Sequence, residues 1–156
     1  MPATEDGLRR LLNFFLYGMI RCAESLGNPT LVLRKVVEEG LRNFLASGLP
    51  MFEASDDARA TCEAFTKAAD ASGLIDGSDT VFRGDSNVVS VEIGDACPYR
   101  RMCTARHDEG RPVHCIRSFM LAEMLRIRLD AVYDWRLNRF GRPCQMTLTR
   151  SRLEKP

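Results

Sequence analysis

The sequence predicts one α+β domain, with helices packed on an antiparallel sheet in the order ααα-ββ-α-ββ. Three observations predict this class. Apolar residues recur at spacings of three and four through the first 73 residues, two β-rich runs follow, and helical spacing then returns once before a second pair of β-rich runs. A chain of 156 residues suits a single core. We expect one domain over residues 1–150 and a frayed tail over residues 151–156.

The first helix is predicted by a row of apolar residues that runs from Leu8 to Cys22 and ends before Gly27-Asn28-Pro29. Phe14, Phe15 and further apolar residues make the row wider than a surface helix needs. We therefore expect this helix to be largely buried or to form the interface of a homodimer.

Two more helices follow in the N-terminal half. The second carries apolar residues from Leu31 to Leu45 and is stopped by Gly48 and Pro50. The third begins at Ser55-Asp56-Asp57, because short polar side chains cap helix N-termini, and it closes at Gly73.

Two hairpins and a fourth helix make up the rest. The runs 80–83 and 88–93 flank the turn Gly84-Asp85-Ser86-Asn87, which predicts a hairpin. A helix is expected from about Val113 to Leu129. The second hairpin is expected to pair residues 131–140 with residues 144–150 across a turn at Gly141-Arg142-Pro143.

Charge is divided unevenly along the chain. Residues 1–96 carry a net charge of −6 and residues 97–156 carry +7. The two halves pair with each other or are simply solvated, or else the basic half binds an anionic ligand, an acidic partner or nucleic acid. The arginines are spread over several elements and no helix-turn-helix or zinc-finger pattern occurs, so direct nucleic-acid binding is not expected.

The chain is expected to be cytoplasmic. No apolar run reaches the roughly 18 residues that span a membrane. The apolar segment after Arg10 differs from a signal peptide, because acidic residues precede it and Asn13 interrupts it. In the cytoplasm cysteines are kept reduced, so six of them point to metal or redox chemistry more than to disulfides.

Four cysteines form the candidate site: Cys97, Cys103, Cys115 and Cys144. They lie near the predicted ends of strands and helices, and we expect them to converge. Four thiolates complete a zinc site or hold a [4Fe-4S] cluster. Cys115 opens a predicted helix, whose N-terminus favours the thiolate. A reversible dithiol switch and simple packing of small apolar side chains are the alternatives.

The remaining cysteines and both histidines have lesser roles in this prediction. Cys22 and Cys62 fall on apolar helix faces, so we expect them to pack in the core. His107 and His114 lie in the cysteine-bearing region, and His114 could replace one thiolate. No hydrolytic triad, glycine-rich phosphate loop or carboxylate pair is present, so the chain is not expected to be an enzyme.

The order of elements resembles the 4-vinyl reductase domain, a hydrocarbon-binding family that shares its fold with subunits of the TRAPP vesicle tether. The resemblance includes Leu26-Gly27, Glu39-Gly40 and the ending from Tyr133-Asp134 to Phe140-Gly141-Arg142-Pro143-Cys144-Gln145-Met146-Thr147-Leu148. It implies a zinc site of cysteines and one glutamate, in which Cys144 matches the last cysteine and Cys115 the early one. The two approach positions hold Tyr133 and Arg136 instead of ligands, so Cys97 and Cys103 would have to supply them.

The resemblance also implies a pocket for an apolar small molecule between helices and sheet. The large apolar candidates for its lining are Phe14, Phe15, Phe119, Met120, Met124 and Trp135. The function expected from the sequence is therefore a ligand-binding or redox-sensing domain with a four-cysteine metal site. The alternatives are an accessory factor of a reductase or pigment-biosynthesis enzyme, and a scaffold or dimerisation module without a ligand.

Overall fold

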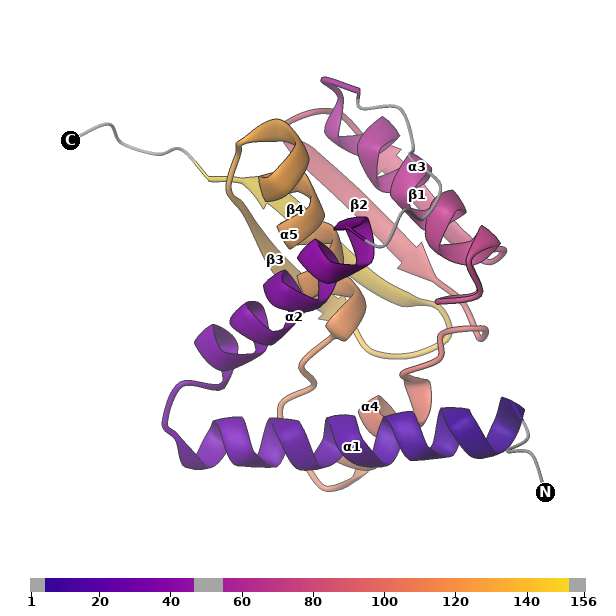
Figure 1. The fold of residues 1–156 in the computed structure, drawn as a ribbon, viewed down its shortest axis with the longest axis vertical. Coiled ribbons are helices and arrows are strands. Elements are labelled where there is room, and N and C mark those ends of the chain that lie inside the picture. The colour runs from indigo at the N-terminus through magenta and orange to yellow at the C-terminus, as the bar shows by residue number, and fades with distance from the viewer. Residues whose placement is uncertain (1–4, 47–54, 152–156) are drawn as a thin grey trace.

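The protein is an α+β domain in which helices cover one face of a four-stranded antiparallel sheet, as the sequence predicts (Figure 1). The computed structural model describes residues 5–46 and 55–151. The expected stop of the second helix at Gly48 and Pro50, and residues 152–156 of the expected tail, lie outside the described residues. Ser151 donates its backbone N–H to the Val132 carbonyl at 2.9 Å, so this residue of the tail is tied to the sheet.

Three helices come first, as expected. They are α1 (Glu5–Ser25), α2 (Pro29–Ala46) and α3 (Ala58–Ala71). The side chain of Asp57 accepts a hydrogen bond from the backbone N–H of Ala60 at 2.7 Å, which is the N-cap that the acidic start of α3 predicts.

The sheet has the strand order β1-β2-β4-β3, with every neighbouring pair antiparallel. Its strands are β1 (Thr80–Gly84), β2 (Val88–Ile93), β3 (Tyr133–Arg139) and β4 (Cys144–Arg150). The turn between β1 and β2 needs glycine at position 84, because its φ is +111° and an added Cβ would lie 2.0 Å from the Val88 carbonyl oxygen.

A helix absent from the expected order lies between the hairpins. This helix, α4 (Arg100–Asp108), occupies the cysteine-bearing stretch, and α5 (Ile116–Leu129) follows it. Only Met102, Cys103 and Arg106 of α4 are buried. A nine-residue helix with so few apolar positions has weak periodicity, which explains why the pattern did not reveal it.

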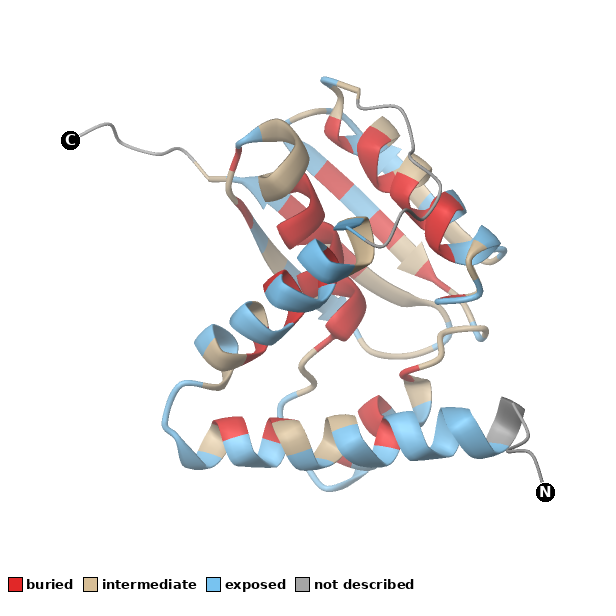
Figure 2. Cartoon of the chain, viewed as in Figure 1, coloured by how far each residue is buried: buried red, intermediate tan, exposed pale blue. Residues whose placement is uncertain are grey.

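The core surrounds α5, which lies between the sheet and the other helices (Figure 2). Every residue from Ile116 to Leu125 is buried. α1 lies apart from the sheet along the base of the molecule and packs chiefly on α2 and α4 (Figure 1). Much of its apolar row is exposed, so burial of the first helix by the rest of the chain, one of the two expected outcomes, does not occur.

The oppositely charged halves pair with each other. Glu24 of α1 pairs with the fully buried Arg106 of α4, and Glu38 of α2 pairs with Arg126 of α5 at 2.7 Å. These pairs join the N-terminal helices to the C-terminal half. Among the described residues, no helix is both long enough and apolar enough to cross a membrane.

Candidate functional site

All four predicted cysteines line one small cavity of about 20 Å³, close to the volume that a single water molecule needs. Cys103 and Cys115 are buried, and Cys97 and Cys144 are partly buried. Arg100 and a set of mainly apolar side chains complete the lining, namely Ile93, Tyr99, Val113, Leu137 and Phe140. The sulfurs therefore face a nearly closed, weakly polar space.

The pairing of β2 with β4 explains why residues so far apart in sequence meet. Ile93, the last residue of β2, pairs with Cys144, the first residue of β4. The chain reaches Cys97 four residues after Ile93. Antiparallel neighbours bring the end of one strand beside the start of the other, so Cys97 and Cys144 are held at the same end of the sheet.

The loop that carries Cys97 is held against Asp79. The Asp79 carboxylate accepts the Ala96 backbone N–H at 2.8 Å, and the Asp79 carbonyl accepts that of Gly94 at 3.1 Å. A Cβ at Gly94 would lie 2.4 Å from an Asp79 carboxylate oxygen. Glycine is therefore required where the loop passes this side chain.

Asn13 of α1 positions Cys103 from outside the C-terminal half. Tyr99, the N-cap of α4, makes no side-chain capping bond. Asn13 supplies it instead, because its amide oxygen accepts the Met102 backbone N–H at 3.0 Å while its amide nitrogen donates to the Pro98 carbonyl at 2.8 Å. The side chain that interrupts the apolar row of α1 thus fixes the start of the helix that carries Cys103.

Arg100 ties together the two loops that border the cavity. Its guanidinium donates to the Gly94 carbonyl at 2.6 Å and to the Gly141 carbonyl at 2.8 Å. The thiol of Cys144 donates to the same Gly141 carbonyl at 3.3 Å. Arg100 is not predictable from the sequence, because nothing in the chain marks one arginine among many as the side chain that joins two loops.

Burial favours the protonated thiols of Cys97, Cys103 and Cys115. Removal from water raises the pKa of Cys97 to about 11 and also raises the pKa of Cys103 and of Cys115. The expectation that the helix N-terminus would favour the Cys115 thiolate is therefore wrong for this arrangement, since complete burial outweighs the helix end. Among the described residues, no group of three or more His, Cys, Asp and Glu side chains has the geometry of a metal site.

The other cysteines and the histidines lie elsewhere. Cys62 is buried in the core of α3, as expected. Cys22 is exposed, contrary to expectation, because its side of α1 faces away from the rest of the chain. His107 packs on the ring of Phe140 with 4.9 Å between centroids, and His114 lies 3.9 Å from Glu24. Neither histidine lines the cysteine cavity.

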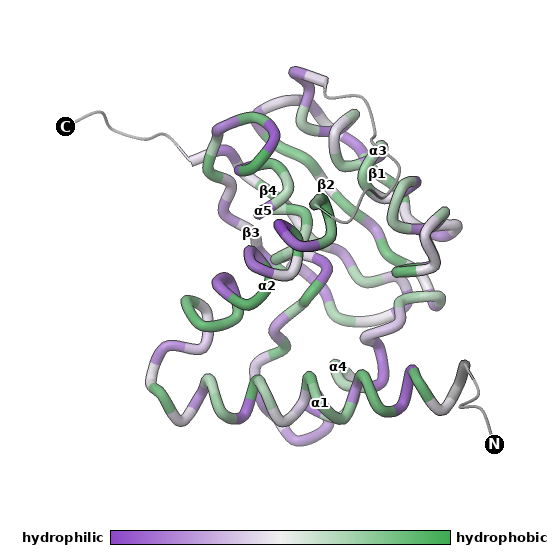
Figure 3. The backbone as a smooth tube through the Cα atoms, viewed as in Figure 1, coloured by the Kyte–Doolittle hydropathy of each residue, from purple (hydrophilic) through white to green (hydrophobic). Residues whose placement is uncertain are grey.

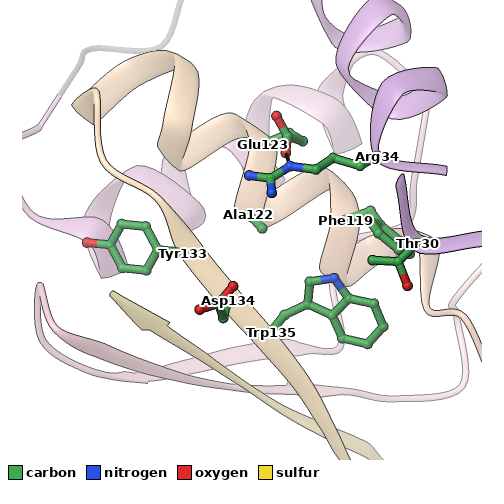
Figure 4. A pocket seen from close by; sticks show the side chains of 8 residues that line it. All are labelled: Thr30, Arg34, Phe119, Ala122, Glu123, Tyr133, Asp134 and Trp135. Carbon is green, nitrogen blue, oxygen red and sulfur yellow. Dashed lines mark hydrogen bonds and ion pairs between the residues drawn. The ribbon is translucent and has the colours of Figure 1, made fainter. Parts of the chain in front are cut away.

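A second and larger pocket, of about 270 Å³, lies between α2, α5 and β3 (Figure 4). Phe119 and Trp135 meet edge to face there, with 4.9 Å between ring centroids. Arg34 pairs with the buried Glu123, and Figure 4 shows its guanidinium above Asp134 and Trp135. The wall of the pocket is completed by Thr30, Ala122 and Tyr133.

The six predicted pocket residues do not come together. Phe119 and Trp135 line the pocket of Figure 4. Met120 and Met124 are buried in the core, where Met120 accepts a hydrogen bond from the Tyr99 hydroxyl at 3.6 Å. Phe14 and Phe15 of α1 are 74% and 61% exposed and line neither this pocket nor the core. Arg34 and Glu123 were missed, because charged residues at helical spacing are typical of a solvated face.

Comparison with protein-family models, with curated proteins and with solved structures finds no match for this chain.

Proposed function

We propose that the protein binds one metal ion, with zinc as the first choice, through Cys97, Cys103, Cys115 and Cys144, and that it serves as a sensor or ligand-binding domain. The observation that carries the proposal is the gathering of four cysteines from four separate segments around one cavity of about 20 Å³. Four thiolates are a complete ligand set for a tetrahedral ion.

The volume of the cavity favours a single ion over an iron–sulfur cluster. A space of about 20 Å³ holds about one water-sized sphere. A [4Fe-4S] cluster contains eight atoms and would require the loops around Cys97 and Cys144 to separate. Zinc requires only that the sulfurs move inward, to about 2.3 Å from the ion.

The weakly polar surroundings favour a closed, structural type of centre. The lining offers mainly apolar side chains beside the four sulfurs, so no position is reserved for a reacting molecule. Binding would release the thiol protons, so metal affinity and folding would be linked. A reversible disulfide between two of the four thiols is the competing use of the same cavity.

The test is a titration of the reduced, metal-free protein with Co²⁺ under anaerobic conditions, followed by displacement with Zn²⁺. Thiolate ligation gives Co²⁺ an intense charge-transfer absorption, and we expect one ion per chain. Cys103→Ser and Cys144→Ser should weaken binding by about tenfold or more. Cys62→Ser, which removes a buried thiol outside the cavity, is the matched control and should bind as the wild type does.

Each other result overturns the proposal in a different way. Protein purified anaerobically with iron and inorganic sulfide would establish a cluster instead of a single ion. Failure of the folded, reduced protein to bind Co²⁺ or Zn²⁺, together with a disulfide formed on mild oxidation, would favour the dithiol switch.

The pocket of Figure 4 favours a second function, the binding of a small molecule that has a flat apolar part and an anionic group. Phe119 and Trp135 supply an aromatic surface. Arg34 uses its Nε toward Glu123, which leaves the two terminal nitrogens of the guanidinium for an anion. A volume of about 270 Å³ accommodates a small aromatic acid.

Anilinonaphthalene sulfonate is a suitable probe, because it combines fused aromatic rings with an anionic group. Trp135→Ala and Arg34→Met should each reduce its fluorescence on binding, whereas Phe15→Ala should not. Loss of the signal in Phe15→Ala alone would locate the probe on the exposed apolar side of α1 and would remove the pocket from consideration.

A further inference from the structure

The protein buries two arginine side chains almost completely, and only one of them has an ionic partner. Arg106 is 0% exposed and pairs with Glu24 of α1. Arg117 is 2% exposed and makes one hydrogen bond, from one terminal nitrogen to the Thr80 hydroxyl at 3.2 Å. Its other terminal nitrogen has no partner, and no carboxylate among the described residues lies within ion-pair distance of it.

Asp76 is the acidic residue on which the charge of Arg117 acts, but it does not form an ion pair with Arg117. Arg117 is one of the charges that lower the pKa of Asp76, but hydrogen bonds from Ser78 are the larger cause. The Asp76 carboxylate accepts the Ser78 hydroxyl at 2.6 Å. Among the described residues, the guanidinium of Arg117 is therefore a buried positive charge without a carboxylate in ion-pair contact.

Arg117 belongs to the surroundings of the cysteine cavity. It is the second residue of α5 and follows Cys115, the N-cap of that helix, by two positions. Thr80, which accepts its hydrogen bond, pairs across β1 and β2 with Ile93, and Ile93 lines the cavity. An anion formed there would lie in the low-dielectric region where this charge has its strongest effect.

An arginine cannot avoid the cost of burial by losing its proton, because its pKa lies above about 12. Removing a partner from a buried ion pair is strongly destabilising, so a guanidinium without an ionic partner is a large penalty for a domain of this size. A divalent ion held by four thiolates carries two net negative charges. Such a centre would supply the counter-charge that the protein itself lacks at this position.

We infer that Arg117 is the buried counter-charge of an anionic four-thiolate centre formed by Cys97, Cys103, Cys115 and Cys144. The inference rests on the proposed metal site and identifies a residue that positions its charge without touching the ion. Arg100 lines the cavity and adds a positive charge there, but its hydrogen bonds to three backbone carbonyls give it a structural role as well.

The experiment compares Arg117→Met with the wild type in two measurements. In the metal-free, reduced protein, denaturant unfolding should show equal or higher stability for Arg117→Met, because an unpaired buried charge is removed. In a Co²⁺ titration the same variant should bind about tenfold to a hundredfold more weakly, as removal of groups that support ligands from outside the first coordination sphere commonly does. Arg117→Lys, which keeps the charge, should recover part of the affinity.

Arg136→Met is the control, since it removes an exposed arginine of β3 and should change neither measurement. If wild-type protein does not bind Co²⁺, the proposed metal site fails. If the wild type binds and Arg117→Met binds with equal affinity, the counter-charge role alone fails. If Arg117→Met does not fold, the Co²⁺ affinities of Arg117→Lys and Arg117→Gln are compared instead. Equal affinities of these two variants would overturn the inference.

Discussion

Helices α1 and α5 both carry many apolar residues, yet they lie in opposite surroundings. Every residue of α5 from Ile116 to Leu125 is buried. On α1, Ile20 is buried, but five large apolar side chains are exposed, from 41% at Leu12 to 74% at Phe14. Figure 2 shows α5 as mostly buried and α1 as mostly exposed, although Figure 3 shows apolar residues along both.

This difference shows that an apolar pattern in the sequence identifies the apolar face of a helix. It does not show which other parts of the chain cover that face. α5 contacts α2, α3, β3 and β4, so it is enclosed on all sides. α1 reaches the rest of the chain through few buried residues, among them Asn13, Ile20 and Ala23. Substitutions should therefore have large effects on α5 and small effects on most of α1.

The largest effect is expected from Leu125→Ala on α5. Leu125 is 0% exposed, and truncation of a buried leucine costs roughly 2–5 kcal/mol through lost burial and an unfilled cavity. Leu11→Ala on α1 removes the same atoms from a side chain that is 51% exposed, and it should change stability by about 0.5 kcal/mol or less. Denaturant unfolding of both variants measures the contrast, and equal losses would contradict it.

Asn13→Ala should be the exception among substitutions on α1. Asn13 is 6% exposed and connects α1 to both ends of a buried turn, the Pro98 carbonyl and the Met102 N–H. Loss of these bonds leaves buried polar groups unpaired, so the free energy of unfolding should fall by about 1–3 kcal/mol. Asn138→Ala, which removes a more exposed amide bonded to Thr147, is the control. If Asn13→Ala lowers the free energy of unfolding no more than Asn138→Ala does, Asn13 does not stabilise the start of α4.

A smaller, pH-dependent effect is expected from Glu38→Gln, which weakens the ion pair between Glu38 of α2 and Arg126 of α5. Hydrogen bonds from Lys35 and Arg42 hold the pKa of Glu38 at about 2, below its ordinary value of 4.5. The stabilising contribution of the carboxylate is therefore complete above about pH 4.5 and is lost as the pH falls toward 2. Wild type should be more stable than Glu38→Gln at pH 7, and the difference should shrink at pH 3. If the difference in stability between wild type and Glu38→Gln is the same at pH 3 as at pH 7, the charge of Glu38 is not its cause.

The smallest effect on folding is expected from Phe14→Glu, because this side chain is already 74% exposed. The free energy of unfolding of the single chain should change by about 0.5 kcal/mol or less. A homodimer of the kind that the sequence predicts would bury this face of α1. A charged side chain at position 14 would oppose that burial, so light scattering should show the variant as a monomer. A wild-type protein that stays monomeric at tens of micromolar concentration would remove α1 as a dimer interface.

The sequence by itself determined the order of the elements apart from α4, because periodicity, capping residues and turn residues are local signals. Asp57 caps α3 through the Ala60 N–H three residues on, and Gly84 adopts the positive φ that the first hairpin needs. It also indicated four cysteines that line one cavity, since their positions at element ends follow from the same local pattern. The short helix α4 was not predicted, because its start is capped by Asn13 of α1 and a helix stabilised in this way needs little apolar periodicity of its own.

Tertiary structure alone decided which apolar face is covered, which charges are paired and how large each cavity is. Cys22 and Cys62 sit on similar helical patterns, yet only Cys62 is buried. Arg106 and Arg117 are both buried arginines, yet only Arg106 meets a carboxylate. The physical reason is the same in each case: burial and ion pairing depend on residues from other elements, and the pairing of β2 with β4 and the packing of α1 on α4 are what bring those residues together.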